Sequence, residues 1–161
     1  MTGRVLGVDP GSRATGWALV VAEAGGYRLE AAGVLRPAGT ERAARLADLQ
    51  RRLGELVARL APDVAAVESS FSGRNPRSGL ALAETRGTIL AVLGGSGVAV
   101  RSYSPATVKS MIVGTGRAEK QQVNYMVVRL LGLAAPPAVD AADAMAVALT
   151  HIHSARGLAT R

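Results

Sequence analysis

The chain contains no cysteine and very few aromatic residues: one Trp, one Phe and three Tyr among 161 residues. Without cysteine the protein has no disulfides, no thiolate metal sites and no cysteine nucleophile. No apolar run approaches the roughly 20 residues of a membrane-spanning helix, and the first residues, 1–4, lead straight into a strand-like run rather than an export signal. We therefore expect a cytoplasmic protein with no membrane partner.

Negative charge is scarce relative to positive charge. The 19 Lys and Arg residues outnumber 12 Asp and Glu residues, which gives a formal net charge of +7. A protein of this charge is attracted to polyanions, and nucleic acid is the obvious candidate. The length is that of one ordinary domain, and no linker divides it, so residues 1–161 are expected to form a single domain.

The order of predicted elements indicates an α/β fold. Apolar runs predict strands at 5–8, 17–22 and 27–35, followed by a helix that Thr40 caps and that ends before Pro62. A strand at 64–67, a polar loop at 69–77, a helix at 80–93 and a strand at 98–100 come next. The pair Ser104-Pro105 begins another helix, and further helices are expected at about 118–131 and from 139 onward. Such an order predicts a mixed five-stranded sheet with helices on both faces.

Four carboxylates follow a common placement pattern. Asp9 ends the first predicted strand, Glu68 ends the fourth, and Asp140 and Asp143 lie three residues apart on one face of the last helix. If the first and fourth strands are neighbours, Asp9 and Glu68 emerge side by side. Carboxylates packed in this way repel one another unless a hard cation such as Mg²⁺ neutralises them, and two such ions can assist phosphodiester hydrolysis.

Each carboxylate also has a simpler interpretation. An Asp before Pro-Gly, as at Asp9, is often only a turn former. Asp140 and Asp143 are also compatible with a role limited to complementing the helix dipole. Glu68 is harder to explain in this way, because a charge at the tip of a buried strand must find a partner. The arrangement of the four, rather than any single residue, favours a metal site.

Several sequence blocks resemble the signature motifs of RuvC-type Holliday-junction resolvases. They are Asp-Pro-Gly-Ser-Arg-Ala-Thr-Gly at 9–16, Val-Glu-Ser-Ser-Phe at 67–71, Gly-Thr-Gly-Arg-Ala-Glu-Lys at 114–120, Asp-Ala-Ala-Asp-Ala at 140–144 and Thr-His-Ile-His at 150–153. The blocks span nearly the whole chain in the family's order. Some family members have a histidine in the last carboxylate block, where this chain has Asp140.

The resemblance implies a single RNase H-like nuclease domain over 1–161, with Asp9, Glu68, Asp140 and Asp143 as metal-binding catalytic residues. It implies a structure-specific endodeoxyribonuclease that resolves four-way DNA junctions by paired, symmetric, metal-dependent phosphodiester hydrolysis in homologous recombination and DNA repair. The implied cofactor is Mg²⁺, with Mn²⁺ as a substitute and two ions per site. The implied partners are a second copy of the chain and a branch-migration motor of the RuvA and RuvB type.

The loop after Glu68 supplies candidate DNA contacts. Phe71 is the only Phe of the chain, and a lone aromatic in a basic loop either packs back onto the domain or stacks on unpaired bases. The resemblance favours stacking. Arg74 and Arg77 flank it and are candidates for phosphate contacts, although solvated loop charges are an equal alternative.

Lysine is nearly absent, and its two positions suggest a role. Only Lys109 and Lys120 occur beside 17 arginines, and both fall in family-like segments. A compact point charge beside the scissile phosphate would explain why Lys is kept there, so both are candidate catalytic residues. His151 and His153 are interpreted mainly as packing residues of the last helix, with assistance in catalysis as the alternative.

Three other functions compete with a RuvC-type nuclease. The Asp-Pro-Gly-Ser turn at 9–12 also resembles the phosphate-binding turn of actin-type ATPases, which need a second similar domain. A non-catalytic junction-binding module and the related YqgF-like resolvases are the others; Phe71 and the Asp140/Asp143 pair favour RuvC. No P-loop pattern occurs, so no nucleotide is expected. Dimerisation is expected through an apolar helix face, with the helix at 80–93 as the candidate.

Overall fold

The computed structural model describes residues 3–69 and 75–159 as five strands and five helices. The strands are β1 (Arg4–Asp9), β2 (Thr15–Glu23), β3 (Gly26–Leu35), β4 (Val64–Glu68) and β5 (Ala99–Tyr103). The helices are α1 (Arg42–Leu60), α2 (Pro76–Gly95), α3 (Pro105–Val113), α4 (Lys120–Leu130) and α5 (Val139–Ala159). In these ranges no helix combines the length and apolarity needed to cross a bilayer.

The strands form one mixed sheet in the order β3-β2-β1-β4-β5. β1 pairs antiparallel with β2 and parallel with β4, and β2 pairs antiparallel with β3. Because β3 is separated from β1 by one antiparallel neighbour, it runs in the same direction as β1, β4 and β5. The C-terminal ends of these four strands therefore meet at one edge of the sheet.

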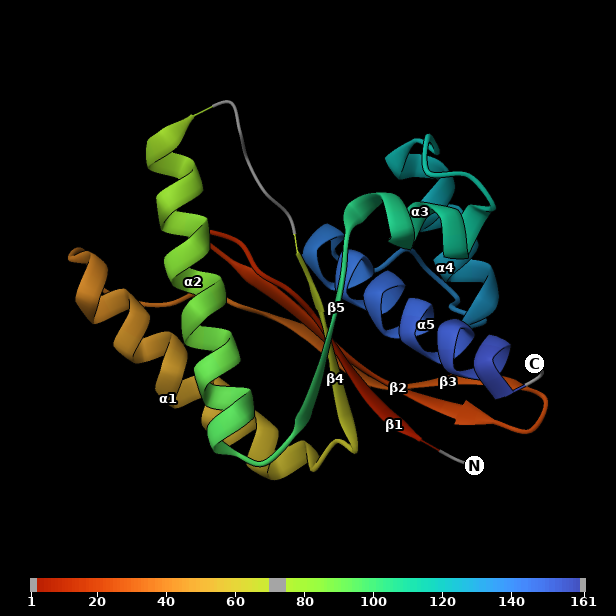
Figure 1. Ribbon diagram of the computed structural model, residues 1–161, viewed down its shortest axis with the longest axis horizontal. Coiled ribbons are helices and arrows are strands. Elements are labelled where there is room, and N and C mark those ends of the chain that lie inside the picture. Colours follow the sequence, from red (N-terminus) through yellow and green to blue (C-terminus); the bar gives the residue numbers. More distant parts are fainter. Residues whose placement is uncertain (1–2, 70–74, 160–161) are drawn as a thin grey trace.

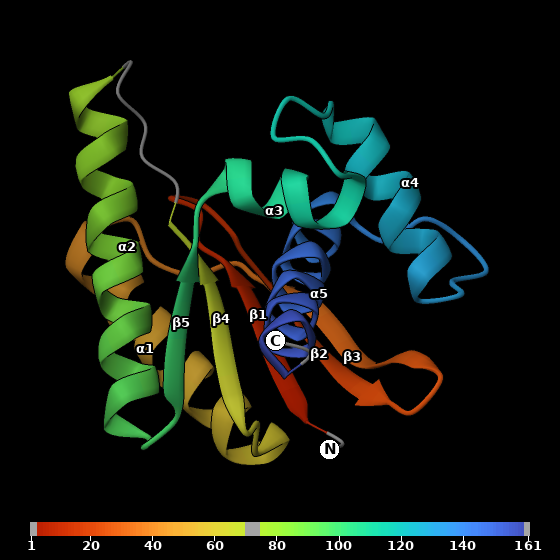
Figure 2. The same cartoon turned by 45° about the vertical axis from the view of Figure 1, so that its right-hand side comes forward.

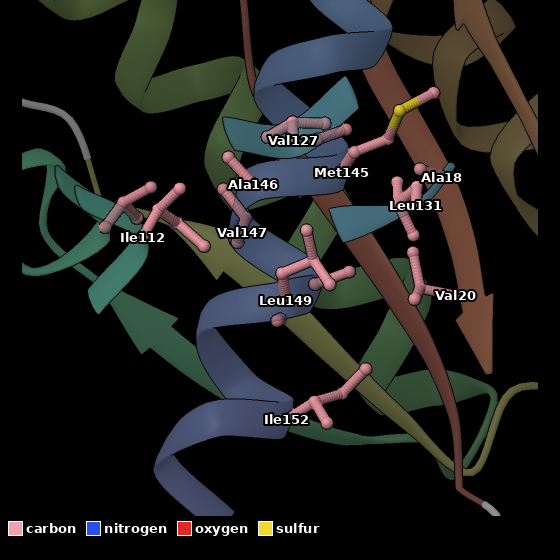
Figure 3. Close-up of a cluster of buried hydrophobic side chains, with 14 of the residues drawn as sticks. Ala18, Val20, Ile112, Val127, Leu131, Met145, Ala146, Val147, Leu149 and Ile152 are labelled. Atoms are coloured by element: carbon pink, nitrogen blue, oxygen red, sulfur yellow. The ribbon is translucent and has the colours of Figure 1, made fainter. Parts of the chain in front are cut away.

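Helices cover both faces of the sheet, as predicted (Figure 1). On one face α1 and α2 bury large side chains, among them Leu49, Leu53, Ile89 and Leu93. On the other face α5 lies across the sheet, with α3 and α4 packed outside it (Figure 2). In this second core α5 contributes Met145, Val147, Leu149, Ile152 and several alanines, and α3 and α4 add residues such as Ile112 and Val127 (Figure 3).

Two glycines allow α5 to approach the sheet closely. A methyl group on Gly7 of β1 would collide with the backbone carbonyl of Ala144, and one on Gly16 of β2 would collide with the carbonyl of Asp140. The helix side of the contact is equally small, since Ala141, Ala144 and Ala148 are all buried. Small residues on both sides therefore bring the helix backbone down onto the strands.

The single tryptophan lies on the α1–α2 face. Trp17 is 9% exposed and pairs with Gly33 of β3, where an added Cβ would come within 2.9 Å of the indole ring. The absence of a side chain at Gly33 leaves room for the ring on the surface of the sheet.

Several predicted boundaries were wrong. Helix α1 begins at Arg42 with Glu41 as its N-cap, so Thr40 does not cap it. The loop predicted at 69–77 ends earlier, because Asn75 caps α2: its side-chain oxygen accepts a hydrogen bond from the backbone N–H of Arg77 at 3.0 Å. The fifth strand extends to Tyr103 instead of ending at Val100. The predicted Ser104 cap of α3 is confirmed, with its hydroxyl accepting from the N–H of Thr107.

Candidate active site

Asp9 and Glu68 leave two adjacent parallel strands at the same edge of the sheet. Val8 pairs with Val67, so the next residue of each strand, Asp9 and Glu68, emerges beside the other. Side chains alternate along a strand, and Gly7 and Ala66 face α5, so both carboxylates point to the α5 side. The expectation that the first and fourth strands are neighbours is confirmed.

The first two turns of α5 bring two more carboxylates to this edge. Gly16 pairs directly with Asp9 across β1 and β2, and the backbone of Asp140 rests on Gly16. Asp143 follows one turn later on the same helix. The close approach that Gly16 permits therefore sets the position of Asp140 relative to Asp9.

The electrostatic environment shows that these carboxylates lie within one another's field. Burial raises the pKa of Asp9 to about 7, and the negative charges of Glu68 and Asp143 add to this effect, whereas Lys120 opposes it. The pKa of Glu68 is also raised, first by burial and then by Asp143. In the protein without bound cations, placing a second or third negative charge here costs free energy.

Both lysines of the chain line the same pocket as two of the carboxylates. Lys120 Nζ donates a hydrogen bond to Asp143 Oδ2 at 2.7 Å, and this bond raises the pKa of Lys120. The positive charge of Lys109 offsets part of the rise in the pKa of Glu68. The pocket, of about 200 Å³, is lined by Glu68, Pro105, Val108, Lys109, Lys120, Val123, Asp143 and Ala146. The two candidate lysines and two of the candidate carboxylates are therefore brought together.

The donor set suits a hard divalent cation. In the described ranges, 3–69 and 75–159, no three His, Cys, Asp or Glu side chains are already grouped to hold a metal ion, and Asp143 is engaged by Lys120. All four candidates are nevertheless carboxylates, which are the ligands that Mg²⁺ and Mn²⁺ prefer. A cation held by Asp9, Glu68, Asp140 and Asp143 would remove the repulsion that raises the pKa values of Asp9 and Glu68.

The remaining candidates are three loop or helix-start residues and the two histidines. Arg77 is exposed in the first turn of α2, and Phe71 and Arg74 lie outside the described residues. His151 Nδ1 is 2.8 Å from the hydroxyl of Tyr103, and burial lowers the pKa of His151. His153 Nδ1 is 3.2 Å from the carbonyl oxygen of Met111, and its ring lies 5.4 Å from that of Tyr27. Both histidines thus make packing contacts farther along α5.

Sequence reasoning missed one residue at this edge, Arg36. It directly follows β3, and its Nη2 lies 4.0 Å from Asp140 Oδ2. The signal was available in principle, because β3 was a predicted strand and its end meets the same edge as the end of β1. Arg36 therefore stands at the end of β3 much as Asp9 stands at the end of β1.

Comparison with known proteins agrees with this geometry. Residues 5–151 match the model of the family described as crossover junction endodeoxyribonuclease RuvC. The chain belongs to the RuvC family. The predicted resemblance is confirmed, and with it the RNase H-like fold.

Individual relatives match the chain over almost its full length. The RuvC protein of Nitratidesulfovibrio vulgaris is 43% identical over 152 residues, covering 94% of this chain and 92% of that protein. The structure of Thermus thermophilus RuvC aligns with a TM-score of 0.88 and 32% identity over 96% of both chains. The same T. thermophilus protein in complex with a Holliday junction substrate aligns with a TM-score of 0.86 and 30% identity, again over 96% of both chains.

Proposed function

We propose that the protein is a structure-specific endodeoxyribonuclease that resolves Holliday junctions during homologous recombination and DNA repair. The observation that carries this proposal is the convergence of Asp9, Glu68, Asp140 and Asp143 at one sheet edge in a chain of the RuvC family. A RuvC relative of similar structure has been solved with a Holliday junction, which supports the same substrate here.

The cofactor proposed is Mg²⁺, with Mn²⁺ as a substitute and two ions per site. Asp9, Glu68, Asp140 and Asp143 would hold them. When bound, such ions supply activation of water and stabilisation of the charge that develops on the leaving oxygen. This chemistry accounts for a site whose described acid–base groups are carboxylates and lysines, with both histidines engaged elsewhere.

The lysines have separate tasks in this proposal. Lys120 pairs with Asp143 in the free protein through the 2.7 Å contact, which offsets part of the negative charge gathered at the site. Lys109, beside Glu68 in the same pocket, presents a second positive charge on the α3 side. Both ammonium groups are placed to attract the DNA phosphate that approaches the carboxylates.

A homodimer and cooperation with a RuvA- and RuvB-type motor are also proposed, because paired nicking of a two-fold symmetric junction requires two sites. The candidate helix α2 divides into two parts: Leu80 is 63% exposed, whereas Ile89 and Leu93 are buried against the sheet. The N-terminal half of α2, with Leu80, is therefore the part available to a partner.

Phe71, Arg74 and Arg77 remain proposed DNA contacts.

The test is strand cleavage of a synthetic four-way junction with Mg²⁺, with binding recorded in parallel. Asp9→Asn and Glu68→Gln are expected to lose paired nicking by about 1000-fold or more while junction binding persists, since they remove cation ligands and leave the basic surface intact. Glu55→Gln, a carboxylate on the exposed face of α1, is the matched control and should cleave like the parent.

The opposite result would favour a non-catalytic junction-binding module. In that case the parent would bind the junction but cleave it with neither Mg²⁺ nor Mn²⁺, across junctions of varied sequence, and the carboxylate variants would behave like the parent.

A further inference from the structure

Arg36 lies at the active-site edge of the sheet, on the side away from the two lysines. Leu35, the last residue of β3, pairs with Thr15, and Gly16 faces Asp140. Lys109 and Lys120 line a pocket together with Glu68, which ends β4, and Asp143, whereas β3 is at the opposite end of the sheet from β4 and β5. The carboxylates on β1 and β4 therefore have lysines on one flank and Arg36 on the other.

The side chain of Arg36 points toward the site but makes no hydrogen bond to Asp140. Its guanidinium Nη2 is 4.0 Å from Asp140 Oδ2, a distance too long for a hydrogen bond, and the side chain is 68% exposed. The contrast with Lys120 and Asp143, 2.7 Å apart, is clear. An exposed pair of this length is weak, so the hydrogen-bond donors of Arg36 are available to another anion.

The backbone around Arg36 is fixed by α1. Arg52 Nη1 donates to the carbonyl of Arg36 at 2.7 Å, and the N–H of Ala38 donates to Asp48 Oδ2 at 2.9 Å. Asp48 and Arg52 also pair with each other, at 3.5 Å. Two side chains of one helix thus clamp the segment on which Arg36 stands, which reduces the entropy lost when its side chain binds a ligand.

We propose that Arg36 binds a backbone phosphate of the DNA on the β3 side of the carboxylates, and that the Asp48–Arg52 clamp positions it. A guanidinium offers donors that match two phosphate oxygens. The inference rests on the proposed function, because it requires that the DNA backbone pass over the four carboxylates. DNA would then be bound by positive charge on both flanks of the site, from Arg36 on one and from Lys109 and Lys120 on the other.

The experiment measures binding of a labelled four-way junction in EDTA, so that cleavage and metal binding do not contribute. Affinity is recorded at several salt concentrations between about 50 and 200 mM for the parent, Arg36→Gln and Arg59→Gln. Each phosphate contact contributes about −0.9 to the slope of log affinity against log salt. Arg36→Gln is expected to reduce the magnitude of the slope by about 1, so that its affinity deficit shrinks about three-fold across this range.

Arg59 is the matched control. It is also an exposed arginine, but it lies in the last turn of α1, at the end where Arg4 donates to the carbonyl of Leu60 and far from the carboxylates. Arg59→Gln should keep the slope of the parent. Arg36→Lys, which retains a positive charge, should restore most of the slope. Melting temperatures of all variants verify that they are folded.

The clamp is tested separately by Asp48→Ala. This change makes the protein more positive, so a general charge effect would strengthen DNA binding. Weaker binding is expected instead, because Ala38 loses its anchor and the segment with Arg36 becomes less ordered.

Three results would overturn the inference. If Arg36→Gln shows the slope of the parent, Arg36 only neutralises Asp140. If Arg59→Gln changes the slope as much as Arg36→Gln does, the effect is one of net charge. If Asp48→Ala binds as well as the parent or better, the clamp does not position Arg36. Junction cleavage by the parent in Mg²⁺ tests the proposed function separately. The proposed function fails only if the parent does not cleave.

Discussion

The two faces of the sheet are packed in different ways. The α1–α2 face buries large side chains, such as Leu53 and Ile89, that fill the space between sheet and helix. On the α5 face Ala144 and Ala148 lie over Gly7, and the backbone of Asp140 lies over Gly16, so helix and strand backbones nearly touch. Bulky packing supplies buried apolar area on one face, whereas close packing on the other fixes the distance between carboxylates on different elements.

Outside the carboxylates themselves, the largest expected effect on cleavage comes from adding one methyl group to the α5 face. In Gly16→Ala the new Cβ would meet the carbonyl of Asp140, which is backbone and can move only with the helix. We expect about a 100-fold loss of junction cleavage, since a displacement of about 1 Å in a catalytic group has this effect. Strand cleavage at saturating protein, under conditions where the variant is folded, provides the measurement.

Gly54→Ala is the control for that substitution. Gly54 lies within α1 and has open space where a Cβ would be added. This change should leave cleavage unaltered and raise the free energy of unfolding by about 0.5–1 kcal/mol, because alanine favours the helix. Equal cleavage by Gly16→Ala and the parent would mean that the spacing of α5 does not control the site.

A large-to-small substitution on the α1–α2 face should lower stability and leave cleavage nearly unchanged. Leu53 is fully buried under the sheet, and Leu53→Ala is expected to lower the free energy of unfolding by about 2–5 kcal/mol. Cleavage per folded molecule should change less than about two-fold, because the carboxylates lie on the opposite face. Urea unfolding together with cleavage at low temperature would separate the two effects, and a large loss of cleavage in folded protein would contradict the division between the faces.

The carboxylate cluster should also destabilise the protein in a pH-dependent manner when no cation is present. Asp9 has a pKa of about 7 in the folded state, against an ordinary value of 3.8. Between these values the folded state binds a proton that the unfolded chain has released, so the free energy of unfolding falls as pH rises and levels off above pH 7. The expected loss contributed by Asp9 is on the order of 2 kcal/mol after allowing for its partial exposure.

Asp9→Asn should remove the part of this pH dependence that Asp9 contributes and be more stable than the parent at about pH 8 in EDTA. Thermal unfolding of both proteins at several pH values tests this. Addition of Mg²⁺ should stabilise the parent more than the variant, because a ligand that binds only the folded state raises its stability. A variant less stable than the parent at high pH would show that Asp9 does not carry the repulsion.

The smallest effect is expected at the far end of α5. Tyr103→Phe removes the hydroxyl that contacts His151 Nδ1, and the free energy of unfolding should fall by about 1 kcal/mol. Junction cleavage should remain within two-fold of the parent, since the contact is structural. A strong loss of cleavage in the folded variant would restore the alternative in which His151 assists catalysis.

The sequence predicted the sheet and the carboxylates because both follow from local patterns. Apolar runs marked the strands, and a charge at the end of such a run, as at Glu68, has few structural explanations; Asp9, before Pro-Gly, became a candidate through its place in the arrangement of four carboxylates. The predicted starts of two helices were wrong because a single capping residue, and not a periodic pattern, sets them. Glu41 rather than Thr40 is the N-cap of α1, and Asn75 caps α2 inside the predicted loop.

Tertiary contacts were beyond the sequence for a different reason. Nothing local distinguishes Gly16, which faces Asp140, from a glycine that merely permits a turn. Asp140 and Asp143 were expected to share one face of the helix, but they pair with different basic side chains. Arg36 lies near Asp140, and Lys120 is hydrogen-bonded to Asp143. Both partners come from segments far away in the chain, so only the assembled sheet brings them together.

The scarcity of aromatic residues has a spectroscopic consequence. Trp17, the only tryptophan, is buried against Gly33 and directly follows Gly16, which faces the backbone of Asp140 in the first turn of α5. Light absorbed at the red edge of the protein spectrum is therefore emitted by one fluorophore, which lies in the α1–α2 core and is one residue from the contact between Gly16 and α5. We expect its emission wavelength and quenching to change when cations or DNA shift α5 on the sheet, because the backbone of Trp17 continues directly from Gly16.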